Sequence, residues 1–240
     1  MRRIKILLVF LLILPHKQEA KGPGLSFFNW MTAYGYVGLG IGSMNYKGEL
    51  DDDMTLKFSR PAFSLVAGYK FNAHCKVKSE LNIGWISASD ARSGDVNRNR
   101  RNLSFRSPVY EATVQFQYEL FANQRKYVYR PKMTPYVVGG FSLFAFNPKA
   151  KLGNEWVALQ PLGTEGQFLG ASLQQPYKRI QIALPMGAGI RYSLSHKLDL
   201  NIELIARKTF TDYLDDVSGS YPDMDAMRAQ NEKAYLLSDR

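Results

Sequence analysis

Three aspartates near the C-terminus have the spacing in this chain that most suggests chemistry. Asp212, Asp215 and Asp216 lie in the stretch RKTFTDYLDDVSGSY (207–221), among aromatic and hydroxyl side chains. Carboxylates this close together can bind a cation or serve as a general acid and base. Neither this stretch nor ELDDDM at 49–54 matches the D-x-D-x-D-G spacing of a calcium loop. The sequence therefore predicts no metal site, beyond weak coordination at the surface.

Histidines are scarce where a hydrolytic site would need them. The chain has three: His16, His74 and His196. His16 belongs to a segment that we expect to be removed, and the other two fall in short connectors between expected strands. Acyl-transfer catalysis needs a nucleophile, a histidine and an acid that converge, and no such set is available. We therefore expect no catalytic residue, no cofactor and no small-molecule substrate.

The chain is strongly basic, with 31 Lys and Arg against 21 Asp and Glu, a formal net charge of +10. One basic run, RNRRN (98–102), precedes Phe105. Nucleic-acid binding would require aromatic side chains interleaved along a groove. An exposed loop that meets lipopolysaccharide phosphates and a merely solvated loop both remain open interpretations. In an exported chain the excess charge favours anionic lipid headgroups or an acidic partner over nucleic acid.

The first 20 residues, MRRIKILLVFLLILPHKQEA, have the pattern of a secretory signal. Three basic residues precede a nine-residue apolar core, Ile6 to Leu14, which is too short to span a bilayer as a helix. We expect residues 1–20 to be a cleaved signal peptide and 21–33 to be an N-terminal periplasmic segment. The single cysteine, Cys75, excludes an intrachain disulfide.

Apolar and polar residues alternate with a period of two over most of the remaining chain, which predicts β-strands. In YEATVQFQYEL (110–120), for example, Val114 and Phe116 share one face while Glu111 and Gln115 share the other. The strand expected at 134–146 is apolar on both faces, and its paired glycines at 139 and 140 indicate a bend or a close backbone approach. Seven strands are expected, at 34–46, 61–71, 77–85, 110–120, 134–146, 179–192 and 198–207.

Three properties favour a membrane barrel over a soluble β-sandwich, which also alternates. The strands are about 10 to 13 residues long, well above the usual globular length. Their polar faces carry charges in mid-strand, and aromatic residues gather near the strand ends, as at bilayer interfaces. Short connectors alternate with long ones, apart from the intermediate ANQRKYVYRPKM (122–133). We therefore predict an all-β fold: a transmembrane antiparallel up-and-down β-barrel of about eight strands over 34–210, with a surface loop and C-terminal remainder over 211–240.

The eighth strand of this barrel is not evident in the sequence. Bacterial single-chain barrels have an even number of strands, and an open edge in lipid is costly. The last residues, DMDAMRAQNEKAYLLSDR (223–240), have the character of a short helix or coil. We expect that the closing strand is missing at the C-terminus. The alternative is that another segment closes the sheet, with LSFFNWMTA (25–33) as the candidate.

The predicted lumen carries charges of both signs. An eight-strand barrel is just wide enough inside for side chains. We therefore expect crossed salt bridges to fill the lumen, with a proton relay as the alternative and no transport pore. The residues placed there are Glu80, Glu111, Glu119, Glu203, Lys70, Lys78, Arg179, Arg191 and Arg207.

Four longer stretches carry a resemblance to a known family. They are NYKGEL (45–50), RNLSFRSPVYE (101–111), FNPKA with WVALQPLGTEGQ (146–167), and RKTFTDYLDDVSGSY (207–221). In order and spacing the chain resembles the PorG-type outer-membrane barrels of the Bacteroidota type IX secretion and gliding machinery. The four stretches together extend over most of the expected mature chain.

The resemblance implies an eight-strand barrel in the cell outer membrane. It also implies attachment, at the periplasmic side, to a ring that contains lipoproteins and belongs to the translocon. That role is structural and not enzymatic. Its partners would be outer-membrane lipids, lipopolysaccharide and the periplasmic ring proteins. Two alternatives stay open: a general anchoring barrel outside any secretion system, and a surface enzyme that modifies lipid or peptide.

Strand counting divides the candidate contact residues between the two ends of the barrel. All four resemblance stretches map to the extracellular mouth, and the ring would contact the opposite end. We expect the periplasmic contact to consist of Arg125, Lys126, Tyr127, Arg130 and Lys132. We expect a packed extracellular cap in which Arg106, Arg207 and Lys208 pair with Glu165, Asp212, Asp215 and Asp216.

Overall fold

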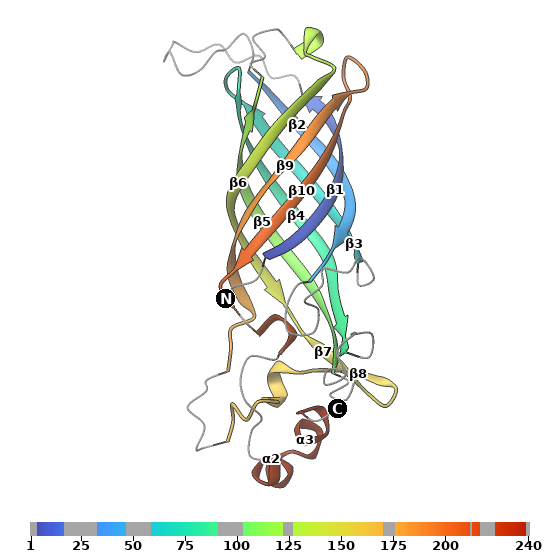
Figure 1. Ribbon diagram of the computed structural model, residues 1–240, viewed down its shortest axis with the longest axis vertical. Helices are drawn as coiled ribbons and strands as arrows, with labels where there is room; N and C mark the ends of the chain where they lie inside the picture. Colours follow the sequence, from blue (N-terminus) through green and yellow to red (C-terminus); the bar gives the residue numbers. More distant parts are fainter. Residues whose placement is uncertain are drawn as a thin grey trace.

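The alternating segments form long antiparallel strands that close into a barrel (Figure 1). The computed structural model describes residues 4–16, 33–46, 59–90, 103–121, 127–169, 176–211, 213–216 and 224–238. The barrel strands are β1 (Ile4–His16), β2 (Tyr34–Met44), β3 (Arg60–Lys70), β4 (Cys75–Ser89), β5 (Ser104–Glu119), β6 (Met133–Phe146), β9 (Ile180–Ser193) and β10 (Asp199–Thr209).

The ring runs in the order β4-β3-β2-β1-β10-β9-β6-β5, and the pairing of β5 with β4 closes it. Every pair of neighbours is antiparallel. Closure leaves none of these eight strands with an unpaired edge, which is the condition for a sheet to cross a bilayer.

The burial pattern is inverted relative to a water-soluble protein. Large apolar side chains point outward, and Leu39 and Phe141 are 67% and 71% exposed. Charged side chains point inward, and Lys78 is only 1% exposed. An apolar outer belt around a polar interior is the pattern of a transmembrane barrel. The predicted fold class is therefore confirmed.

The two ends of the barrel differ in their connections. At the short-turn end, 71–74 joins β3 to β4, 194–198 joins β9 to β10, and the 3-10 helix η3 (Tyr127–Tyr129) precedes β6. The long-loop end, at the bottom of Figure 1, carries the remaining short strands and helices that lie outside the ring. These are β7 (Lys149–Leu152), β8 (Glu155–Ala158), η4 (Gln160–Leu162), η5 (Tyr213–Asp215), α2 (Met224–Gln230) and α3 (Glu232–Ser238).

Two neighbouring glycines of β6 behave differently. A Cβ at Gly140 would lie 2.1 Å from the carbonyl oxygen of Val114, whereas a Cβ at Gly139 would meet no atom within 4 Å. The close backbone approach predicted for this pair is therefore confirmed at Gly140.

In the described ranges, no helix is long and apolar enough to cross a membrane.

The barrel has the expected eight strands, but β1 corrects the expected place of the closing strand. It lies between β10 and β2, in register from Ile4 with Lys208 to Ile13 with Asp199, and from Leu7 with Met44 to His16 with Gly35. The closing strand that we expected to be missing at the C-terminus is thus formed at the N-terminus. A search for alternation missed it because its sequence, IKILLVFLLILPH, is almost continuously apolar.

The cleaved signal peptide stays a prediction. Removal of residues 1–20 would take β1 out of the ring and leave the facing edges of β2 and β10 unpaired. The alternative closing segment, 25–33, lies outside the described residues except for Ala33.

Candidate functional site

Crossed salt bridges fill the middle of the lumen. Lys78 Nζ lies 2.8 Å from Glu80 and 2.7 Å from Glu203, and each of these side chains is at most 2% exposed. Nearer the long-loop end, Arg207 Nε lies 2.8 Å from Glu111. The expected filling of the lumen by ion pairs is therefore confirmed for these residues. Arg179 is an exception, because it is exposed and precedes β9 outside the barrel.

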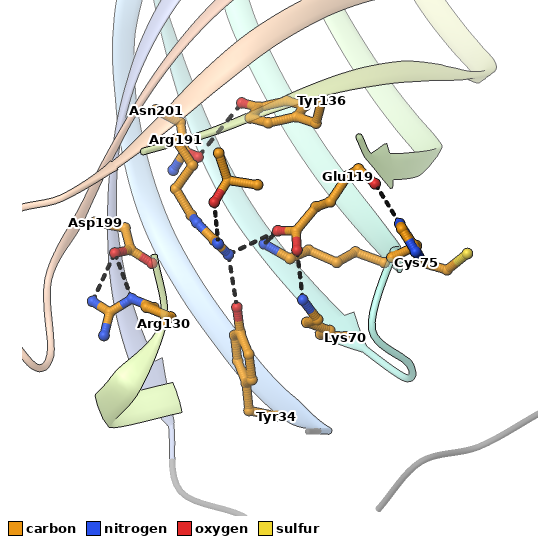
Figure 2. A network of polar contacts seen from close by, with 12 residues as sticks. Tyr34, Lys70, Cys75, Glu119, Arg130, Tyr136, Arg191, Asp199 and Asn201 are labelled. Carbon is orange, nitrogen blue, oxygen red and sulfur yellow. Dashed lines mark hydrogen bonds and ion pairs between the residues drawn. The ribbon is translucent and has the colours of Figure 1, made fainter. Parts of the chain in front are cut away.

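One carboxylate forms ion pairs with three cationic side chains at the short-turn end (Figure 2). Glu119, the last residue of β5, lies 2.5 Å from Lys70, 2.8 Å from Lys76 and 2.8 Å from Arg191. All four side chains are almost fully buried. The negative charge of Glu119 offsets the cost of burying the cations, because each would otherwise lose its hydration without compensation.

Arg191 extends this cluster to further strands. Its guanidinium donates to the hydroxyl of Tyr34 on β2 at 3.1 Å and to that of Thr134 on β6 at 2.9 Å. Together with the ion pairs of Glu119, these contacts connect β2, β3, β4, β5, β6 and β9 at one point inside the barrel. We call Glu119, Lys70, Lys76 and Arg191 the Glu119 cluster. Its side chains fill the lumen at the short-turn end.

A second ion pair, between Arg130 and Asp199, stabilises the segment that follows η3. Arg130 donates to the Asp199 carboxylate from Nη2 at 2.7 Å and from Nε at 2.9 Å. It also donates to the backbone carbonyls of Ser195 and His196, at 2.7 Å and 3.2 Å. Charge-assisted bonds with this geometry hold the segment before β6 against the β9–β10 turn.

This arrangement changes the role expected for Arg130. We expected Arg130 to be part of the periplasmic contact; its side chain is buried and holds the turn beside it. Arg125 and Lys126 lie outside the described residues, and Tyr127 begins η3. Lys132 is exposed, as are the neighbouring Val128 and Tyr129. The described surface at this end is therefore aromatic and apolar as well as basic.

Asp215 and Asp216 pack into a cap at the long-loop end, where hydroxyl groups of other described residues bind them. The Tyr46 hydroxyl donates to Asp215, and the hydroxyls of Thr164 and Tyr177 donate to Asp216, the latter at 2.6 Å. Both aspartates are buried. The cap thus joins residues that lie far apart in the sequence, and hydroxyl groups donate hydrogen bonds to both of its buried carboxylates.

The cations assigned to this cap lie elsewhere. Arg207 pairs with Glu111 inside the lumen, so its expected pairing with the loop acids is wrong. Arg106 points outward, with its guanidinium carbon 5.2 Å from the ring centroid of Trp156. Lys208 is exposed on β10, and the backbone N–H of Glu165 donates to Gln167. Asp212 lies outside the described residues.

The backbone of Asp216 and the state of its partner Tyr177 both suit this hydrogen bond. Its backbone has a φ of 62°, in the left-handed region that Asp tolerates better than most residues. Burial and the adjacent Asp216 carboxylate raise the pKa of Tyr177, so its phenol stays protonated and can donate. Tyr177 also stacks on Tyr213, with ring centroids 4.6 Å apart. Alternation could not reveal any of these partners, because the cap consists of loops.

The interior offers little room for a substrate. A pocket of about 40 Å³ remains beneath the cap, lined by Glu111, Phe144, Arg207 and Leu214 among others. That space admits a few water molecules and not a metabolite. Within the described ranges, no three His, Cys, Asp or Glu side chains come together where they could hold a metal ion.

Comparison with known proteins finds a family model that matches this chain. The family model described as Domain of unknown function (DUF6089) matches residues 25–159, which is more than half of the chain. No curated protein matches. Among solved structures, the chain is similar to Ail, the attachment invasion locus protein of Yersinia pestis, in complex with the heparin analogue sucrose octasulfate. That similarity covers 87% of this chain and 99% of Ail, at 9% identity and a TM-score of 0.32.

Proposed function

The chain belongs to the DUF6089 family, and we propose that it is a non-enzymatic outer-membrane barrel that anchors the type IX protein secretion machinery. In this proposal the short-turn end faces the periplasm and contacts a ring that contains lipoproteins. The long-loop end faces the cell exterior. The resemblance of the four loop stretches to PorG-type barrels supports the secretion role, and the apolar outer belt supports the membrane location.

The observation that carries the proposal is the construction of the short-turn end. The Glu119 cluster fills the lumen there, and the Arg130–Asp199 pair fixes the segment next to it. A rigid surface loses little conformational freedom on binding, so it suits a structural contact. Buried ion pairs occupy much of the described lumen, which supports a structural role.

The proposed contact lies in and around the 122–133 connection. The exposed side chains of Val128 and Tyr129 offer apolar area, and Lys132 adds positive charge. Arg125 and Lys126 precede them in the sequence. Buried aromatic groups and flanking charges are the residue types that dominate protein interfaces. We infer that the ring surface facing them is acidic.

Charge reversal tests this contact. The double variant Arg125→Glu, Lys126→Glu should recover much less of the ring lipoproteins when the barrel is affinity-purified from membranes, because like charges would then face each other. The matched control is Lys151→Glu, Lys178→Glu, which reverses two exposed lysines at the long-loop end. We expect the control to recover the ring as the unaltered protein does.

Two results would contradict the proposal. Equal recovery with both double variants would reject the 122–133 contact. Absence of ring lipoproteins from the unaltered protein would instead favour a general anchoring barrel outside any secretion system.

A further inference from the structure

A groove on the outer wall of the barrel has the chemistry of an anion site. It lies at the long-loop end and holds a volume of about 580 Å³. Strands β4 and β5 and the β7–β8 hairpin supply most of its lining. The residues that matter for its chemistry are Arg60, Trp85, Ser87, Arg106 and Trp156.

The groove begins where the apolar belt ends. Along β5, the outward-facing side chains change from Val114 and Tyr110, both 55% exposed, to Arg106. Along β4, they change from Ile83 to Trp85 and then to Ser87. Tryptophan and tyrosine mark the headgroup level of a bilayer, because their rings have an apolar body and a polar edge. The groove is therefore at the height of lipid headgroups.

Two arginines supply its charge. Arg106 places its guanidinium over the Trp156 ring, a contact that uses the face of the group and leaves its N–H edge available to an anion. Among the described residues, Arg60 donates from Nε to Ser87 Oγ at 2.8 Å. No carboxylate lines the groove, and neither arginine forms an ion pair in the described part of the chain.

We propose that this groove binds the phosphorylated headgroup of a lipid in the outer leaflet. Arg60 and Arg106 bind the phosphate oxygens, since guanidinium groups match phosphate with paired N–H donors. The serine hydroxyls hydrogen-bond to the polar headgroup, and Trp85 packs on the first segment of the acyl chains. A bilayer presents this lipid at high local concentration beside the groove. The inference rests on the membrane location and orientation proposed above, and not on the contact with the periplasmic ring.

Native mass spectrometry of the purified full chain in detergent tests the site. The probe is lipid A with its phosphate groups, compared with the same lipid after the phosphates are removed. The unaltered protein should retain the phosphorylated lipid more strongly. The variant Arg60→Gln, Arg106→Gln should bind it at least about tenfold more weakly, because charge-assisted hydrogen bonds are lost.

The matched control is Lys178→Gln, Lys197→Gln, which removes two exposed cations that do not line the groove. It should bind the phosphorylated lipid as the unaltered protein does. Equal affinity in the arginine variant, or equal retention of the lipid without phosphates, would overturn the proposal. Inorganic phosphate that displaces the lipid at micromolar concentration would also overturn it, because the site would then select the anion and not the lipid.

Discussion

At the residue scale, the lumen of this barrel places unlike charges where water is largely excluded. Lys70, Lys76 and Arg191 come from three strands and meet the carboxylate of Glu119. Such an arrangement is stable only while the charges compensate one another, because a buried ion without a partner costs several kcal/mol. The stability of the cluster therefore depends on the negative charge of Glu119.

Replacement of Glu119 by glutamine should destabilise the barrel strongly. Glu119→Gln keeps the size of the side chain but leaves three buried cations around a neutral amide. We expect the free energy of unfolding to fall by about 3–5 kcal/mol, as for other buried ion pairs broken at one partner. Unfolding by guanidinium chloride in lipid vesicles, followed by tryptophan fluorescence, measures the change.

A matched variant separates this effect from a simple loss of charge. Glu155→Gln removes a carboxylate from the exposed β7–β8 hairpin and should change the free energy of unfolding by less than about 0.5 kcal/mol. If Glu119→Gln were as stable as Glu155→Gln, the Glu119 cluster would not hold the short-turn end together.

The sequence predicts which residues face the lumen but not which of them meet. Alternation places Glu119 and Arg191 on polar faces, because side chains alternate strictly along a strand. Their contact spans β5 and β9, which are separated in the ring by β6. Contacts across a lumen depend on strand tilt and stagger, and these are properties of the closed ring. For the same reason the sequence assigned Arg207 both to the lumen and to the cap, and the structure pairs it with Glu111 in the lumen.

At the scale of elements, β1 decides whether the ring is closed. It forms ten register pairs with β10 and ten with β2. Strand β1 runs antiparallel to β10. It therefore has the same direction as a C-terminal strand that followed β10 would have. Without β1, the edges of both neighbours would face lipid with unpaired N–H and C=O groups, each at a cost of several kcal/mol.

The closing role of β1 can be tested with the segment supplied as a separate peptide. Closed barrels that resist detergent migrate faster on gels before heating than after it. We expect a chain of residues 21–240 to lack this shift, and a peptide of residues 4–16 to restore it. A peptide with Leu8→Pro and Leu12→Pro should fail, because proline cannot donate the ladder hydrogen bonds.

Two results would assign the closing position to another strand. One is a full shift from residues 21–240 alone, and the other is equal rescue by the proline peptide. The sequence predicted the seven alternating strands well, since one face of each meets lipid and the other meets polar groups. It could not distinguish an apolar export signal from an apolar strand, because neither has a polar face.

At the scale of the whole molecule, the barrel is closed at both ends by different means. Ion pairs of the Glu119 cluster close the short-turn end. Loops close the other end, where Asp215 and Asp216 bind hydroxyl groups and Leu214 joins the apolar core. Between them lies the apolar belt. This division suits a protein that is fixed in a membrane and offers separate surfaces to the two sides.

Site-specific photocrosslinking in intact cells tests the anchoring role most directly. A photoreactive amino acid at position 129 lies at the exposed end of η3, and one at position 236 lies on α3 at the long-loop end. We predict that position 129 crosslinks to a periplasmic lipoprotein of the secretion ring and that position 236 does not. Crosslinks to the ring from position 236, with none from position 129, would contradict the proposed orientation and contact.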